Sequence, residues 1–127
     1  MPKQLIQTDR APQPSGAYSQ GLRAGDFVFV SGQVGIDPGT GEFAGDTIEA
    51  QTAQTLANVK AILEAAGAGM DDVVKATVHL RYIELFSRFN AVYLEHFPDP
   101  KPTRTMVGSG LGNALVEIDV IAYMGDQ

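Results

Sequence analysis

Leu115-Val116-Glu117-Ile118-Asp119-Val120-Ile121-Ala122-Tyr123 is the stretch of this 127-residue sequence that decides the fold. Side chains of a β-strand alternate between two faces, and every second residue from Val116 to Ala122 is apolar. The opposite face carries the carboxylates of Glu117 and Asp119 between apolar residues. This stretch therefore predicts a strand buried on one side, with a mixed second side that is either wet or covered by another subunit.

Other strands are predicted on both sides of this stretch. Residues 73–81 alternate in the same way, with Val74, Ala76, Val78 and Leu80 on the apolar side. The turn residues Ala24-Gly25-Asp26 precede an aromatic and β-branched run, so residues 18–31 are predicted to form a hairpin. Residues 103–107 form one more strand, after a loop rich in proline.

Two amphipathic helices are predicted between the strands. Residues 47–66 place apolar side chains at helical spacing, with Asp46 and Glu49 at the spacing of a capping box and a glycine, Gly67 or Gly69, at the end. Residues 84–96 return to this period, and Pro98 and Pro100 prevent its continuation. The apolar stripe of the second helix consists of Leu85, Phe86, Phe89, Val92, Tyr93 and Phe97.

The predicted order is β-β-α-β-α-β-β, which is typical of an α+β sandwich with two helices on one face of one sheet. No linker divides the chain, so one domain is expected over residues 1–127. Because no third helix is predicted to cover the mixed face, we favour an oligomer in which the sheets of different subunits meet.

Composition restricts the chemistry. The sequence contains no cysteine and only two histidines, so thiolate chemistry is excluded and a multi-histidine metal site is improbable. The formal net charge is −6 with no basic cluster, which argues against nucleic acid as a partner. The N-terminus lacks the apolar run of a signal peptide, and no apolar stretch is as long as a membrane helix needs, so a cytoplasmic location is the default.

Arg104 and Glu117 are the candidate chemical groups. A guanidinium on a strand matches the two oxygens of a carboxylate, although an ordinary ion pair is the alternative. A carboxylate in an apolar strand can exchange protons with water, although an outward-facing strand residue is the more common case. Asp119 shares the face of Glu117, which makes a paired-carboxylate glycosidase site conceivable but weak.

Three other patterns carry less information. Tyr18, Ser31 and Gly32 lie at the ends of the hairpin strands, where they could orient a ligand or simply satisfy local hydrogen bonds. Gly108-Ser109-Gly110-Leu111-Gly112 lacks the lysine and the following helix of a phosphate loop, and is predicted to be a hairpin loop. His79 is more often a packed or interface residue than a general base.

Taken in order, short motifs along nearly the whole chain resemble the reactive intermediate deaminase family, also called RidA/YjgF or L-PSP endoribonuclease-like. The motifs are Ala11-Pro12, Gly16-Ala17-Tyr18-Ser19-Gln20, Val30-Ser31-Gly32-Gln33, Gln54-Thr55-Leu56-Ala57-Asn58-Val59, Val73-Val74-Lys75-Ala76-Thr77-Val78, Phe89-Asn90-Ala91-Val92-Tyr93, Pro102-Thr103-Arg104-Thr105 and Val116-Glu117-Ile118-Asp119-Val120-Ile121-Ala122.

This resemblance implies a chorismate-mutase-like fold and a homotrimer with ligand clefts between subunits. It also implies hydrolysis of enamines or imines of the 2-aminoacrylate type to a 2-keto acid and ammonia, without a cofactor. In that reading Arg104 binds the substrate carboxylate and Glu117 positions or activates water. The expected cleft lining is Tyr18, Ser31, Gly32, Asn90 and Met106, the last at a position often held by cysteine.

The same residues leave other functions open. A larger enamine carboxylate such as 2-aminomuconate would use the same arginine and glutamate. A protein that binds or senses keto acids without catalysis would need Arg104 but not Glu117. Ribonuclease activity is the third alternative, and the negative net charge argues against it. The interval from Leu111 to Glu117 is about one residue shorter than is usual in the family, at the rim of the expected cleft.

Overall fold

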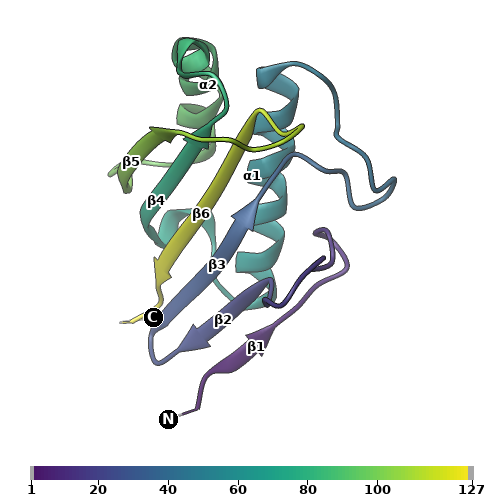
Figure 1. Ribbon diagram of the computed structural model, residues 1–127. Coiled ribbons are helices and arrows are strands. Elements are labelled where there is room, and N and C mark those ends of the chain that lie inside the picture. The colour runs from purple at the N-terminus through teal and green to yellow at the C-terminus, as the bar shows by residue number, and fades with distance from the viewer. Residues whose placement is uncertain (1, 126–127) are drawn as a thin grey trace.

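The computed structural model describes residues 2–125, so Met1, Asp126 and Gln127 of the expected domain lie outside the described residues. Six strands form one mixed sheet in the order β1-β2-β3-β6-β4-β5, and both α-helices pack on the same face of it (Figure 1). The strands are β1 Gln4–Ile6, β2 Gly21–Ala24, β3 Phe27–Gln33, β4 Val73–Leu80, β5 Thr103–Gly108 and β6 Val116–Tyr123, and the helices are α1 Ile48–Ala65 and α2 Phe86–Tyr93.

The predicted α+β architecture with two helices on one sheet face is confirmed, with one strand more than expected. β1 is an edge strand of three residues, and only Ile6 in it is buried. Such a short edge strand leaves no alternation to read in the sequence. The hairpin is confirmed as the antiparallel pair β2–β3, although β2 begins at Gly21 rather than at residue 18. The preceding residues form a loop instead, which the buried side chain of Gln20 holds through Thr8 and Pro12.

β6 lies in the middle of the sheet, and its predicted apolar face is buried from Val116 to Ala122. The prediction for β4 is wrong at its first residues, since Val73 is buried and Val74 is 43% exposed. A register shift against β6 between Val73 and Lys75 reverses the alternation there. The expected hairpin at Gly108–Gly112 is also wrong. β5 pairs in parallel with β4, which separates β5 from β6.

Helix α1 forms where its apolar stripe predicts, but its start differs from the prediction. Thr47, not Asp46, is the N-cap, and its hydroxyl accepts a hydrogen bond from the backbone N–H of Ala50 at 3.1 Å. Glu49 is not a capping residue, because its carboxylate accepts two hydrogen bonds from Arg88 of α2. This ion pair lowers the pKa of Glu49 to about 2.

Helix α2 is shorter than the predicted span 84–96, because the residues at both ends form 3-10 turns, Ile83–Leu85 and Leu94–His96. Of its predicted apolar stripe, Phe89, Tyr93 and Phe97 are buried, whereas Phe86 is 40% exposed and therefore does not belong to the core. Within residues 2–125 no helix combines the length and the apolar character needed to cross a membrane.

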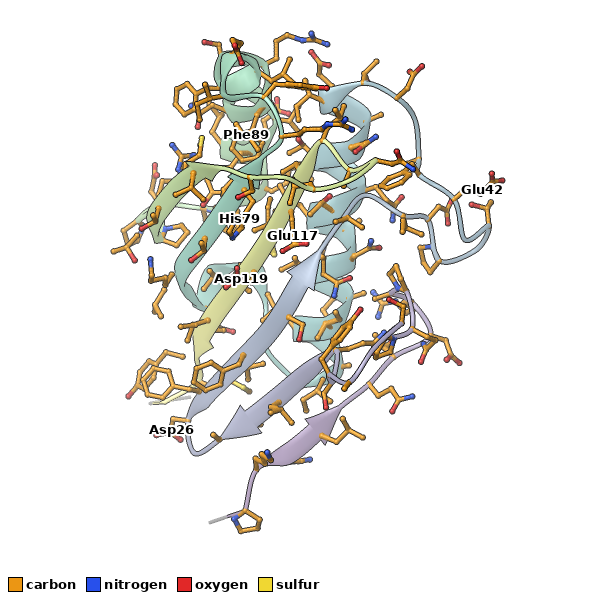
Figure 2. The ribbon with its side chains drawn as sticks, in the orientation of Figure 1. Asp26, Glu42, His79, Phe89, Glu117 and Asp119 are labelled. Carbon is orange, nitrogen blue, oxygen red and sulfur yellow. The ribbon has the colours of Figure 1, made fainter. Side chains whose placement is uncertain are left out.

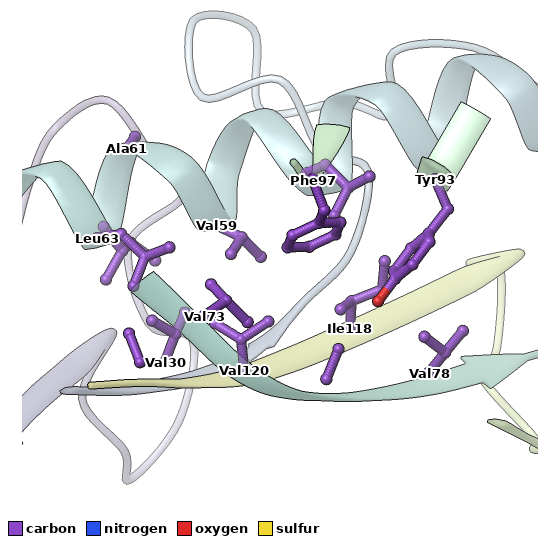
Figure 3. Packing of buried hydrophobic residues seen from close by; sticks show 14 of the residues in the cluster. Val30, Val59, Ala61, Leu63, Val73, Val78, Tyr93, Phe97, Ile118 and Val120 are labelled. Atoms are coloured by element: carbon purple, nitrogen blue, oxygen red, sulfur yellow. The ribbon is translucent and has the colours of Figure 1, made fainter. Parts of the chain in front are cut away.

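The core lies between the sheet and the helices (Figure 3). Tyr93 and Phe97 approach the sheet from the end of α2, above Ile118 and Val78 of the central strands. The other face of the sheet has no helix over it in the described part of the chain (Figure 1). Large apolar side chains on this open face remain exposed, among them Phe27 at 42%, Phe29 at 43% and Tyr123 at 37%.

The N-cap assignment is testable by a pair of alanine substitutions. Thr47→Ala removes the only side-chain oxygen that caps α1 in the structure, and we expect it to lower the free energy of unfolding by about 1 kcal/mol. Asp46→Ala is the matched control and should change it by less than about half of that. Denaturant titrations at equal protein concentration measure both values. An equal or larger loss for Asp46→Ala would contradict the assignment.

Candidate functional site

The predicted site residues fall into two groups on opposite faces of the sheet. The first group lies on the open face, where Tyr18, Ser31 and Gly32 line a depression of about 560 Å³ together with Asp119 of β6. The second group surrounds Arg104 at the edge strand β5, beside helix α2, where a second depression of about 400 Å³ is found.

A bulge in β3 shapes the first group. The register of β3 against β6 shifts between Val30 and Gln33, so Ser31 and Gly32 stand at the irregularity. The Ser31 hydroxyl donates a hydrogen bond to the backbone carbonyl of Ser19 at 2.5 Å, which ties the segment before β2 to this bulge. The exposed ring of Tyr18 belongs to the same segment. The bulge therefore gathers the three predicted residues in one place.

The Glu117 carboxylate occupies the space that a side chain at position 32 would fill. A methyl group added at Gly32 would lie 2.7 Å from Oε2 of Glu117, which is too close for two unbonded atoms. Glycine at this position therefore leaves room for the carboxylate to lie across the bulge. The structure brings Glu117 together with Ser31 and Gly32 although they come from strands far apart in the sequence.

Other polar groups surround Glu117 on the open face (Figure 2). His79 is its direct cross-strand partner on β4, and the Nδ1 atom of His79 lies 2.6 Å from the Ser109 hydroxyl. Asp119 follows on the same face of β6, and burial raises its pKa, although His79 and Lys75 oppose part of this rise. His79 is thus half-buried, and its hydrogen-bond partner Ser109 lies in the loop after β5.

Arg104 lies on the helix-covered side of the sheet. It pairs with Ala76, which is fully buried, so the Arg104 side chain leaves β5 toward α2. Its Nη1 atom donates a hydrogen bond to Oδ1 of Asn90 at 2.7 Å. Its Cζ atom is 4.8 Å from the ring centre of Tyr93 and 5.7 Å from that of Phe86. The structure therefore places Asn90 in contact with Arg104, and Met106 lies two residues further along β5, partly buried against the core.

The electrostatic surroundings of Arg104 are unusual for a half-buried arginine. Three salt bridges are present in residues 2–125, and none of them includes Arg104. Its hydrogen-bond partner is a neutral amide, and its other neighbours are two aromatic rings. A partly buried cation without a counterion is costly. This site is therefore suited to an anion that is not part of the protein, such as a carboxylate.

Tyr93 and Phe86 are the site residues that the sequence reasoning missed, since both were assigned to the core stripe of α2. A signal for them exists in the sequence. Phe86, Asn90 and Tyr93 are spaced four and three residues apart, which places them on one face of a helix. Because Asn90 lies between Phe86 and Tyr93 on this face, a contact of Asn90 with Arg104 predicts that both rings lie near the guanidinium.

Arg104 and Glu117 do not converge within one chain. The register places Arg104 with Ala76 on the helix-covered face and Glu117 with His79 on the open face. Within the described residues, no group of three or more His, Cys, Asp or Glu side chains is arranged to hold a metal ion. A small molecule that contacts both the guanidinium and the carboxylate would therefore need two copies of the chain.

Comparisons with known proteins agree on one family. The family model described as "Endoribonuclease L-PSP" matches residues 8–124. A RutC family protein of Pyrococcus horikoshii is 47% identical over 95% of this chain and 98% of its own length. A 2-iminobutanoate/2-iminopropanoate deaminase of Dermatophagoides farinae is 42% identical, covering 97% of this chain and 98% of its own. The crystal structure of RidA from the Antarctic bacterium Psychrobacter sp. PAMC 21119 has a TM-score of 0.91 at 42% identity, covering 94% and 98% of the two chains.

The raised pKa of Asp119 generates a pH-dependent prediction. A folded-state pKa above the unfolded value of 3.8 means that the folded chain binds this proton more tightly, so the charged form lowers stability at neutral pH. Asp119→Asn should therefore raise the melting temperature at pH 7, and the gain should disappear as the pH falls below about 3.8. Thermal melts between pH 3 and 8 test this. A variant less stable than the wild type at pH 7 would contradict it.

Proposed function

Because this chain belongs to the RidA/YjgF family, described as endoribonuclease L-PSP, we propose that it hydrolyses reactive enamines and imines of the 2-aminoacrylate and 2-iminopropanoate type to 2-keto acids and ammonia. One close relative is named as a deaminase of such imines. The observation that carries the proposal is Arg104, a half-buried guanidinium without an acidic partner in residues 2–125.

In this proposal Arg104 holds the carboxylate of the substrate. A guanidinium has five N–H donors, and Asn90 accepts from Nη1. The remaining donors suit the two oxygens of a carboxylate, and such charge-assisted bonds are stronger than neutral ones. Binding the carboxylate also fixes the position of the adjacent imine carbon. The substrate's own charge supplies the counterion that the protein does not provide.

Glu117 acts on water. As the oxygen of a water molecule bonds to the imine carbon, the Glu117 carboxylate accepts a proton from that water. Glu117 returns this proton to the nitrogen, which leaves a hydroxyl and an amine on the same carbon. The hydroxyl proton then passes to the nitrogen as the C–N bond breaks, so ammonia leaves while the carbonyl of the keto acid forms. The overall reaction consumes one water and needs no redox partner. The depression on the open face is lined by Tyr18, Ser31 and Gly32, and Gly32 leaves the space for the Glu117 carboxylate. We therefore propose that these three residues surround the water and the reacting carbon.

The proposed active form is a homotrimer whose sites lie between subunits. The open face of the sheet exposes Phe27, Phe29 and Tyr123, and burying such side chains against a second subunit is favourable. In the proposed site one subunit contributes Arg104, Asn90 and Met106. The neighbouring subunit contributes Glu117 and the bulge of β3. Arg104 and Glu117 lie on opposite faces of the sheet in one chain, and a site between two subunits would let both contact one substrate.

Two substitutions test the proposed function. Arg104→Ala removes the carboxylate partner and should raise KM for an imine generated in the assay, such as 2-iminopropanoate, by roughly 10- to 100-fold. Glu117→Gln should lower kcat by roughly 100-fold or more while binding of pyruvate, the keto-acid product, persists. Ammonia release above the uncatalysed rate is the measurement. Arg88→Ala, an exposed arginine paired with Glu49, is the matched control and should behave like the wild type.

The outcomes separate the alternatives. A protein that releases no ammonia above background but binds keto acids through Arg104 would be a sensor, and the catalytic proposal would be wrong. If larger enamines were hydrolysed faster than three-carbon ones, the protein would be a deaminase of a larger enamine carboxylate that uses the same Arg104 and Glu117. Cleavage of RNA that is lost with Glu117→Gln would favour the endoribonuclease activity in the family's name, which the net charge of −6 argues against.

A further inference from the structure

The orientation of Arg104 depends on helix α2, and this points to a residue that the proposed mechanism does not use. We propose that Tyr93 is the positioning residue of Arg104, its buried ring supporting the guanidinium so that the free N–H donors face the substrate carboxylate. This inference rests on the proposed function for its catalytic consequence. The packing of the Tyr93 ring against Arg104 is present without any substrate.

The Tyr93 ring is itself held in place. Tyr93 is the last residue of α2 and is 4% exposed. Its ring centre lies 5.4 Å from that of Phe89 and 4.8 Å from that of Phe97, so it is the middle member of a row of three buried rings. Figure 3 shows Tyr93 and Phe97 side by side between the helices and the sheet. A ring packed in this way cannot follow the motions of an arginine side chain, and it therefore acts as a fixed support.

Two contacts from one turn of α2 restrict the guanidinium. The Tyr93 ring lies 4.8 Å from Cζ of Arg104, within the range of a cation–π interaction, and Asn90 accepts a hydrogen bond from Nη1 at 2.7 Å. The ring limits how the guanidinium can move along one direction, and the amide limits its rotation. Without the Tyr93 ring, Arg104 would keep this hydrogen bond and only the more distant, exposed ring of Phe86.

The ring, and not the hydroxyl, is the part of Tyr93 that acts. In the described residues the Tyr93 hydroxyl is buried and makes no hydrogen bond. Burial raises the pKa of the phenol, and Arg104 opposes part of this rise, so the group is neutral at physiological pH. Arg104 lies close enough to the phenol to oppose this rise, so Tyr93→Phe is the substitution that separates the hydroxyl from the ring. Phe86, whose ring centre lies 5.7 Å from the Arg104 Cζ atom, also presents an aromatic face to the guanidinium and has no hydroxyl.

Substitutions at position 93 test the proposal through KM. Tyr93→Leu removes the ring and should raise KM for the imine, and the Kd for pyruvate, by roughly 3- to 30-fold with kcat changed less than about twofold. Tyr93→Phe restores the ring without the hydroxyl and should rescue both values to within about threefold of the wild type. Melting temperatures are recorded for each variant, because Tyr93 also belongs to the core.

Leu63→Ala is the core control, because Leu63 is fully buried in α1 and belongs neither to the row of rings nor to the recorded contacts of Arg104. It should lower the melting temperature and leave KM unchanged. If Leu63→Ala raised KM as much as Tyr93→Leu does, the effect of Tyr93 would be general core damage and the proposal would be overturned. Failure of Tyr93→Phe to rescue KM would overturn it as well.

A measurement without substrate separates this inference from the proposed function. Side-chain protons of an arginine held over an aromatic face are shifted upfield by the ring current, so NMR of the wild-type protein should show shifted Arg104 signals. Arg104→Lys identifies these signals by their loss. Unshifted signals in the wild type would contradict the positioning role, even if Tyr93→Leu failed to fold. Shifted signals in a protein that hydrolyses no imine would reject the proposed function and keep the support of Arg104 by Tyr93.

Discussion

The alternation of side chains along a strand is the constraint on which the site depends. Because both helices cover the same face of the sheet, each strand residue is committed either to the helix side or to the open side. Arg104 falls on the helix side and Glu117 on the open side. No rotation of either side chain exchanges the two faces. A reaction that needs both groups at one small molecule therefore requires the contact of two chains, which the exposed aromatic residues of the open face also favour.

Each half of the site uses a different physical device. On the open face, a bulge in β3 and a glycine without a side chain make room for the Glu117 carboxylate. Beside α2, a partly buried guanidinium is held by an amide and an aromatic ring, and no carboxylate of residues 2–125 neutralises it. In the proposed function, the arrangement at Glu117 positions a proton acceptor and the arrangement at Arg104 keeps a positive charge available. The proposal thus assigns acid–base chemistry and anion binding to very few residues of a small acidic chain without cysteine.

Most of the fold could be predicted from the sequence because its strands and helices are long enough to show a period. The apolar face of β6 and the stripe of α1 are examples. The errors fall where local geometry interrupts a period, as at Val74, where the register shifts, and in the three-residue β1. Arg104 and Glu117 were candidates from their positions in strands with apolar neighbours, and the family resemblance added their roles together with Asn90 and Met106. The division of Arg104 and Glu117 between two faces follows from strand parity only once the parallel pairing of β5 is known. Tyr93 was missed because a buried aromatic residue is usually core, and here it is core and support together.

In the proposed active form, Arg104 and Glu117 act on one substrate from two different subunits. The most direct test is to refold Arg104→Ala chains together with Glu117→Gln chains in equal amounts and to measure imine hydrolysis by the mixture. Each parent lacks one half of every site. Random mixing restores a complete site wherever an intact arginine meets an intact glutamate, so we expect about one quarter of wild-type activity. A mixture no more active than its parents, with mixed oligomers shown by mass spectrometry, would contradict the claim.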